Sequence, residues 1–256
     1  MTDPTVTSDA PAAYLDRVAG TEPARAYKKD LLTALRIEPG NRVLDVGCGP
    51  GTDLASLAAA VGPAGTVIGV DQDPVMIATA RARTAEDPAI EIREGDAHHL
   101  PVDSGDVDRA RADRVLMHVA DPGAALAELH RVLRPGGLLT LAEPDWDTLA
   151  IDHPDLESAR GFTRFVAEHV NRNQAIGRRL PRLATAAGFT VLAVRNAAVV
   201  FSDFETAEAV LGIRRNTERA LAAGRLSNAE PWLAHLTTGV FFGTFSFITV
   251  LAQSAV

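Results

Sequence analysis

The chain has 256 residues, a hydrophobic fraction of 46% and a formal net charge of -8. This length supplies a sizeable core, and the acidic balance disfavours nucleic acid as a partner because phosphate backbones bind basic surfaces. Cys48 is the only cysteine, which excludes an intramolecular disulfide, an iron–sulfur cluster and a cysteine-rich zinc site.

The first residues, 1–13, are polar and acidic and lack the apolar centre of a signal peptide. No apolar run reaches membrane-spanning length without a glycine or a polar break. We therefore expect a cytoplasmic protein with no membrane partner, and a loose tail over residues 1–10.

Helix and strand patterns alternate as far as residue 143. An N-terminal helical part, 11–36, contains predicted helices at Ala12–Val18 and Pro23–Leu35. The core that follows, 37–143, alternates strands with helices, and this order indicates a parallel sheet covered on both faces. The strands are expected at Arg42–Val46, Thr66–Val70, Ile90–Glu94, Val107–Ala112 and Leu138–Glu143, and the helices at Thr52–Val61, Pro74–Arg83 and Gly123–Leu133.

The alternation changes in the last part of the chain, 144–256. We expect an irregular acidic loop over Pro144–Pro154, and one helix that opens with a capping box at Ser202–Glu205 and continues to about Ala222. The β-rich run Gly239–Ala252 has no room for a helix and a strand after it, so we place it as an antiparallel last strand. The other expected elements are helices at Asp155–Val170, Gln174–Ala187 and Ala229–Leu236 and a strand at Thr190–Phe201.

The segment 43–52 carries the most informative pattern, an apolar run that ends in an acidic residue and breaks into the alternate glycines of Gly47–Gly51. This pattern predicts a buried strand, a tight turn of bare backbone and the start of a helix. The G-x-G-x-G spacing differs from the dinucleotide fingerprint, and Pro50 removes an N–H that phosphate would use. The Gly-Lys-Ser/Thr of a phosphate loop is absent. A nucleoside bound without phosphate contacts is the third interpretation.

Acidic residues also end the next two predicted strands. Asp71, at the tip of the second strand, can accept both hydroxyls of a ribose, a device that dinucleotide enzymes share. Asp96, at the tip of the third strand, can accept a hydrogen bond from the exocyclic amine of adenine. Ribose and adenine contacts without phosphate contacts favour S-adenosylmethionine as the ligand.

These motifs together resemble the class I S-adenosylmethionine-dependent methyltransferases, closely over residues 42–147 and loosely elsewhere. The matching segments are V-L-D-V-G-C-G-P-G-T at 43–52, G-V-D-Q-D-P at 69–74, E-G-D-A-H-H-L-P at 94–101 and R-V-L-R-P-G-G-L-L at 131–139. The chain is most similar to ubiquinone/menaquinone C-methyltransferase-like enzymes and to bacterial methyltransferases of natural products. The resemblance implies a Rossmann-like α/β fold in one domain, with a mostly parallel seven-stranded sheet, an N-terminal helical lid and helical insertions after the fifth and sixth strands.

The resemblance also implies roles for individual residues. The methionine end of S-adenosylmethionine would lie against the start of the glycine loop, the ribose beside the second strand and the adenine beside the third. The cofactor-binding residues are Asp45, Gly47, Cys48 and Gly49 at the loop, Asp71 and Gln72 for ribose, Asp96 and Ala97 for adenine, and Arg111 at the methionine end.

His118 matches a histidine that is common after the fourth strand in this subgroup. It is a candidate general base, because its ordinary pKa suits proton transfer near neutral pH, but it can equally orient the cofactor or bind backbone. The pair His98-His99 is not expected to hold a metal, because adjacent side chains do not face one way and no third ligand has suitable spacing. Asp113 and Arg114 are interpreted as a local ion pair.

Candidate substrate residues lie on both sides of the core. Asp145 and Trp146 follow the fifth strand, at the edge where open α/β sheets bind ligands. Tyr14 and Tyr27 belong to the N-terminal helices. Basic residues of the same helices are expected to form a solvated face, and most phenylalanines after residue 160 are expected to be core.

The sequence therefore predicts a methyltransferase that acts on a small molecule at O, N or C, with S-adenosylhomocysteine as product, and that is a monomer or a homodimer. Two alternatives remain open. The fold can bind S-adenosylmethionine without methyl transfer, as a cyclase-like enzyme or a regulatory module, or the protein can be an NAD-dependent reductase.

Overall fold

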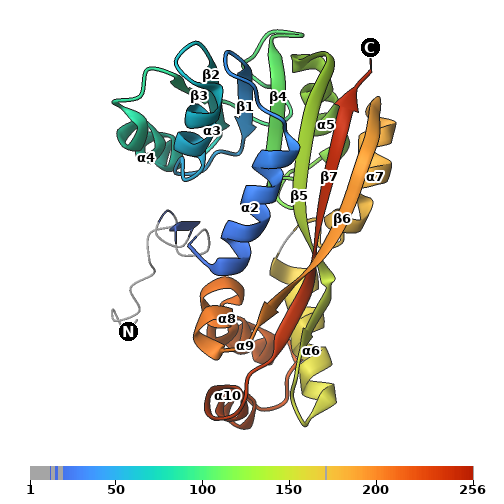
Figure 1. The fold of residues 1–256 in the computed structure, drawn as a ribbon. Coiled ribbons are helices and arrows are strands. Elements are labelled where there is room, and N and C mark those ends of the chain that lie inside the picture. The colour runs from blue at the N-terminus through green and yellow to red at the C-terminus, as the bar shows by residue number, and fades with distance from the viewer. Residues whose placement is uncertain (1–11, 13–14, 17–19, 171, 256) are drawn as a thin grey trace.

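The computed structural model describes residues 12, 15–16, 20–170 and 172–255, so Tyr14 lies outside the described residues. One seven-stranded sheet has the order β3-β2-β1-β4-β5-β7-β6 (Figure 1). β7 runs antiparallel to β5 and β6, and the other neighbouring strands are parallel, which confirms the predicted arrangement. The strands are β1 (Arg42–Val46), β2 (Thr66–Asp71), β3 (Ile90–Glu94), β4 (Val107–Asp113), β5 (Leu133–Ile151), β6 (Phe189–Phe201) and β7 (Gly243–Ser254).

Side chains of the central strands alternate between two layers of helices. Val43 and Val67 are buried with apolar residues of α3, whereas their neighbours Leu44 and Ile68 are buried with those of α5 and α7. Successive side chains of a strand point to opposite faces, so helices cover both faces of the sheet, as predicted. The helices are α2 (Glu22–Ala34), α3 (Leu54–Val61), α4 (Pro74–Thr84), α5 (Pro122–Val132), α6 (Leu156–Val170), α7 (Ile176–Ala186), α8 (Phe204–Leu211), α9 (Ile213–Ala222) and α10 (Ala229–Thr238).

Two of these helices begin with an Asp-Pro pair that caps the helix. The Asp73 carboxylate accepts a hydrogen bond from the Val75 N–H at the start of α4. The Asp121 carboxylate accepts from the N–H groups of Gly123 and Ala124 at the start of α5. Such caps stabilise a helix start by typically about 1 kcal/mol, and here they hold the loops that follow β2 and β4.

The loop expected at Pro144–Pro154 is wrong, because β5 continues to Ile151 and pairs there with β7. Leu149 and Ile151 are buried apolar residues of this half of the strand. The acidic composition that indicated a loop is accommodated by a partner distant in sequence, since Asp145 forms an ion pair with Arg178 of α7.

The single helix expected from Ser202 to Ala222 is also wrong, because Gly212 separates α8 from α9. Gly212 has a φ of +57°, a left-handed conformation that ends one helix before the next begins. Asp203 rather than Ser202 caps α8, with its carboxylate accepting from the Thr206 N–H. The break lets both short helices bury apolar side chains in the same hydrophobic cluster.

The strands β5, β6 and β7 extend beyond the rest of the sheet and meet α6, α8, α9 and α10 at one end (Figure 1). Buried side chains between these elements form a hydrophobic group that we call the aromatic cluster, and Leu31 and Tyr27 of α2 adjoin it. The expectation that most late phenylalanines are core is confirmed. The aromatic members are Tyr27, Trp146, Phe162, Phe165, Phe201, Phe204, Trp232, Phe241, Phe245 and Phe247. None of the helices within the described residues has both the length and the apolar character that a bilayer crossing requires.

Candidate cofactor site

The loop between β1 and α3 presents bare backbone at the C-terminal edge of the sheet. Gly47 and Gly49 have φ values of +67° and +55°, which L residues with a side chain rarely adopt. A Cβ at Gly47 would lie 2.4 Å from Cγ2 of Val115, so the loop packs closely against the turn after β4. At Gly49 the nearest atom to such a Cβ is Cδ1 of Leu15, at 3.6 Å, so a ligand can approach this backbone. The buried thiol of Cys48 lies on the inner side of the loop.

Asp71 lies at the end of β2 and faces this loop. One carboxylate oxygen accepts a hydrogen bond from the Gly49 N–H at 2.9 Å, and the other accepts from the Asp73 N–H at 2.9 Å. A carboxylate oxygen can accept two hydrogen bonds, so each oxygen keeps one acceptor position. This arrangement fits two neighbouring hydroxyls. Gln72 is exposed beside it.

Asp96 follows β3 and is held by His98. Its Oδ1 accepts from the His98 N–H at 2.8 Å and pairs with His98 Nδ1 at 2.5 Å. These hydrogen bonds lower the pKa of the Asp96 carboxyl, which therefore stays ionised near neutral pH. Ala97 is partly buried against the core beneath it.

Asp45 and Arg111 meet within a buried ionic cluster. They are register partners on β1 and β4, and Arg111 Nε lies 3.1 Å from Asp45 Oδ1. Arg111 also contacts Asp53 at 2.8 Å and Asp113 at 3.2 Å. Lys28 of α2 reaches Asp53 at 2.7 Å. The cluster thus links α2, β1, β4 and the start of α3 at the edge where the glycine loop lies.

The pKa values of the residues in this cluster are shifted in different directions. Burial raises the pKa of Asp45 to about 6, and the opposing charge of Arg111 does not cancel this effect. Burial acts on Asp53 in the same sense, but Arg111 and Lys28 outweigh it and hold the pKa of Asp53 below its ordinary value. Burial alone would lower the pKa of Arg111, and the surrounding carboxylates raise it instead. Burial therefore makes Asp45 easier to protonate than an ordinary aspartate, while Arg111 stays cationic.

Tyr27 joins the ionic cluster to the aromatic cluster. Its hydroxyl donates to the Asp113 carboxylate at 3.2 Å, and its ring centroid lies 4.4 Å from that of Phe247. The Trp146 ring lies 4.8 Å from Phe245, two residues along the same strand. Residues i and i+2 of a strand share a face, so the structure brings Tyr27 and Trp146 to one face of β7.

The two predicted substrate residues lie within β5 and not after it, and they are in different surroundings. The Asp145 carboxylate is buried and accepts from Arg178 Nη2 at 2.7 Å, so its charge is already paired. The Trp146 Nε1 is buried and donates no hydrogen bond within the described part of the chain. Trp146, rather than Asp145, therefore offers an unsatisfied polar atom next to the aromatic cluster.

His118 is an exposed residue of the turn after β4, four positions beyond Arg114. Desolvation and the Arg114 charge lower the pKa of His118, so its imidazole is neutral and able to accept a proton near neutral pH. The interpretation of Asp113 and Arg114 as an ion pair is confirmed at 3.6 Å. Arg114 has a φ of +59°, an unusual backbone conformation for a residue with a side chain.

Glu143 is a site residue that we did not predict. Its Oε1 accepts from the N–H groups of Val115 and Leu116 at 2.9 and 2.6 Å, and its Oε2 is buried without a hydrogen-bond partner among the described residues. It thereby holds the turn that carries His118 and packs on Gly47. The available signal was a glutamate at the last position of a predicted buried strand.

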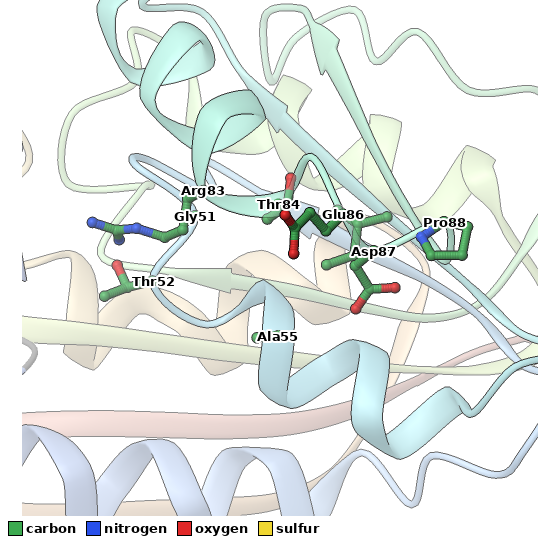
Figure 2. Close-up of a pocket in the computed structure, with 9 residues that line it drawn as sticks. Gly51, Thr52, Ala55, Arg83, Thr84, Glu86, Asp87 and Pro88 are labelled. Atoms are coloured by element: carbon green, nitrogen blue, oxygen red, sulfur yellow. The ribbon is translucent and has the colours of Figure 1, made fainter.

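Two cavities border the start of α3. One of about 390 Å³ lies between the start of α3 and the end of α4 and is lined by Thr52, Arg83 and Asp87, among others (Figure 2). Its described lining includes none of the predicted cofactor residues. The other, of about 500 Å³, lies between α2 and α3 and is lined by Arg111 and Asp53 together with basic residues of α2. The second cavity therefore adjoins the ionic cluster.

Within the described residues, no group of three or more His, Cys, Asp or Glu side chains is arranged to hold a metal ion. His98 is engaged with Asp96, and the neighbouring His99 is exposed.

The strand order, the single antiparallel strand and the loop at β1 define the class I methyltransferase fold. Solved structures share it. A methyltransferase from Aquifex aeolicus has a TM-score of 0.56 at 16% identity and covers 96% of this chain and 95% of its own. Geranyl diphosphate methyltransferase has a TM-score of 0.60 at 18% identity, covering 91% and 79%. The cyclase SpnF has a TM-score of 0.61 at 20% identity, covering 91% and 82%. At these identities the likeness concerns the fold alone.

Sequence comparison identifies the family. Residues 44–141 match the model described as a methyltransferase domain. A 37.1 kDa protein in a transposon of Streptomyces fradiae is 52% identical over 244 residues, 94% of this chain and 71% of that protein. A demethylmenaquinone methyltransferase of Staphylococcus epidermidis is 32% identical over 137 residues, 54% of this chain and 57% of the enzyme. The chain belongs to the class I S-adenosylmethionine-dependent methyltransferases. The match with the demethylmenaquinone methyltransferase spans little more than half of the length of that enzyme.

Proposed function

We propose that this protein transfers the methyl group of S-adenosylmethionine to a small-molecule acceptor, at O, N or C, in secondary or cofactor metabolism. One observation carries the proposal. The glycine loop, the Asp71 and Asp96 carboxylates and the Asp45–Arg111 pair lie along one edge of the sheet, in the order in which methionine, ribose and adenine would need them. The aromatic cluster begins next to that edge, at Tyr27.

The residues present fit the cofactor. The open backbone at Gly49 and the free acceptor positions of Asp71 match a ribose that lies against the loop, with Gln72 beside it. Asp96 and Ala97 would bind adenine. When bound, S-adenosylmethionine supplies an electrophilic methyl group on a sulfonium sulfur. Asp45, with Arg111 holding its orientation, would bind the methionine end together with the backbone of Gly47 and Cys48.

The chain's other contribution is to align an acceptor and to exclude water. Alignment of two reactants can supply much of the rate enhancement of such a displacement. Tyr27 and Trp146 would hold the acceptor at the boundary between the ionic and aromatic clusters. The substrate side of the protein would then be formed by residues 144–256 together with the helical part at 11–36. His118 would accept a proton on an unprotonated ring nitrogen when the acceptor atom must lose one.

The test combines binding with turnover. Calorimetry should show that S-adenosylmethionine and S-adenosylhomocysteine bind, and that NADH does not. Incubation with phenolic, quinol and amine acceptors should release S-adenosylhomocysteine, detected chromatographically, with a mass gain of one methyl group on the acceptor. Binding of NADH without binding of S-adenosylmethionine would contradict the proposal.

A cyclase-like function is the second candidate, because the cyclase SpnF shares this fold. It predicts cofactor binding and conversion of a polyunsaturated compound without a mass change and without release of S-adenosylhomocysteine. A substitution of His118 by alanine helps to separate the two. If the protein is a methyltransferase, His118→Ala should slow methyl transfer to a protonated nucleophile and leave the affinity for S-adenosylmethionine unchanged.

A further inference from the structure

The loop after β3 contains a chain of hydrogen bonds that ends at the start of α5. The Asp121 N–H donates to His98 Nε2 at 3.1 Å, and His98 Nδ1 lies 2.5 Å from Asp96 Oδ1. Asp121 itself caps α5 through its carboxylate. The chain therefore runs from a capped helix start, through one imidazole, to the carboxylate at the tip of β3.

The partners determine the tautomer of His98. A backbone N–H can only donate, so Nε2 must accept and carry no proton. The ring proton of the neutral imidazole is then on Nδ1, where it donates to Asp96 Oδ1. The imidazole thus acts as a directional link and not merely as a polar neighbour.

The link leaves one oxygen of Asp96 for a ligand. Oδ1 receives both hydrogen bonds from His98, while Oδ2 receives none within the described part of the chain. The Asp96 side chain is 52% exposed, whereas that of His98 is 20% exposed. An exposed carboxylate ordinarily samples several rotamers, and fixing it before binding lowers the cost of ordering it on binding.

We propose that His98 is a positioning residue for adenine recognition, which fixes Asp96 so that Oδ2 accepts a hydrogen bond from the exocyclic amine. The inference rests on the proposed function and adds a residue to it. His98 does not touch the cofactor in this proposal. His98 is expected to affect only the preference for a base that carries an exocyclic amine over a base that lacks it.

The test compares two ligands that differ at that amine. S-adenosylhomocysteine has the amine, and S-inosylhomocysteine carries a carbonyl oxygen in its place. Wild-type protein should bind the first at least about tenfold more tightly by calorimetry, because a hydrogen bond to a charged group contributes roughly that much. Asp96→Asn should remove most of this preference.

His98→Ala should reduce the preference about three- to tenfold by weakening S-adenosylhomocysteine binding, with little change for S-inosylhomocysteine. His98→Asn should restore part of the preference, because the asparagine amide can place an N–H near the position of Nδ1. This second variant also controls for a folding defect in His98→Ala. His99→Ala, at the exposed neighbour, is the matched control and should match wild type.

The outcomes separate the two levels of the argument. Absence of binding of either ligand to wild-type protein would overturn the proposed function and this inference together. Binding of both ligands with equal affinity would leave the function standing and overturn the adenine contact. An unchanged preference in His98→Ala, or an equal loss for both ligands, would overturn the positioning role alone.

Discussion

Replacement of Glu143 by glutamine tests the buried carboxyl beneath the turn after β4. Glu143 is fully buried, and burial is the main cause that raises its pKa to about 8 from an ordinary value of 4.5. Its hydrogen bonds from Val115 and Leu116 act in the opposite direction and do not cancel this effect. Glutamine keeps an acceptor oxygen for the same two N–H groups but cannot ionise.

The sign of the effect follows from proton binding. Between pH 4.5 and about 8 the folded state keeps a proton on Glu143 that the unfolded state releases, so the free energy of unfolding falls as the pH rises. The slope is about 1.4 kcal/mol per pH unit, and the loss across this window is at most about 5 kcal/mol. Glu143→Gln lacks this loss. The free energy of unfolding of the variant minus that of wild type should therefore rise by several kcal/mol from about pH 5 to about pH 8. Above that range the difference should stay constant.

The assay is urea unfolding followed by circular dichroism in small pH steps, with wild type and variant measured side by side. The difference between the two proteins at each pH cancels the titration of all other groups. Glu86→Gln, at an exposed turn, is the control for the loss of a carboxylate away from the core. A Glu143→Gln difference that stays constant from pH 5 to pH 8 would refute the buried, protonated carboxyl.

Three further substitutions test the site. Gly47→Ala should lose roughly 2–4 kcal/mol of stability in thermal unfolding, because its left-handed φ is joined by a contact with Val115. Gly40→Ala, which has a φ of +88° and no atom near its Cβ position, should lose only about 1 kcal/mol, and equal losses would contradict the steric argument. Asp71→Asn should weaken S-adenosylhomocysteine binding by about tenfold or more in calorimetry, since an amide offers one acceptor instead of two, and an unchanged affinity would exclude the ribose contact. Tyr27→Phe should cost about 1 kcal/mol in unfolding by losing the bond to Asp113 while keeping the ring, and a larger loss would show that the hydroxyl does more than this.

The parts of the fold that the sequence predicts are those with local signals. The glycine loop needs positive φ values at Gly47, Gly49 and Gly51, and only glycine adopts them readily, so the three glycines mark the turn. The helix starts at Asp73 and Asp121 follow from a capping side chain next to a proline.

The parts that the sequence does not predict depend on partners far along the chain. The acidic stretch after Glu143 indicates a loop until Arg178 is seen to pair with Asp145 from another helix. The ionic cluster is equally hidden, because Lys28, Asp53 and Arg111 are distant in sequence and any of them alone fits an exposed surface. Periodicity shows which residues face inward. It does not show which charge neutralises which.

Helix α2 connects the two halves of the site through adjacent residues. Lys28 pairs with Asp53 at the start of α3, and Tyr27 reaches Asp113 at the end of β4 while its ring packs on Phe247. A displacement of α2 therefore disturbs the ionic cluster and the aromatic cluster together. Ionic contacts hold one side of Tyr27 and an aromatic ring the other. Under the proposed function, an acceptor that packs beside this ring would therefore lie next to the methionine end of S-adenosylmethionine. This geometry favours an acceptor with an apolar body and one nucleophilic atom over one that is charged throughout.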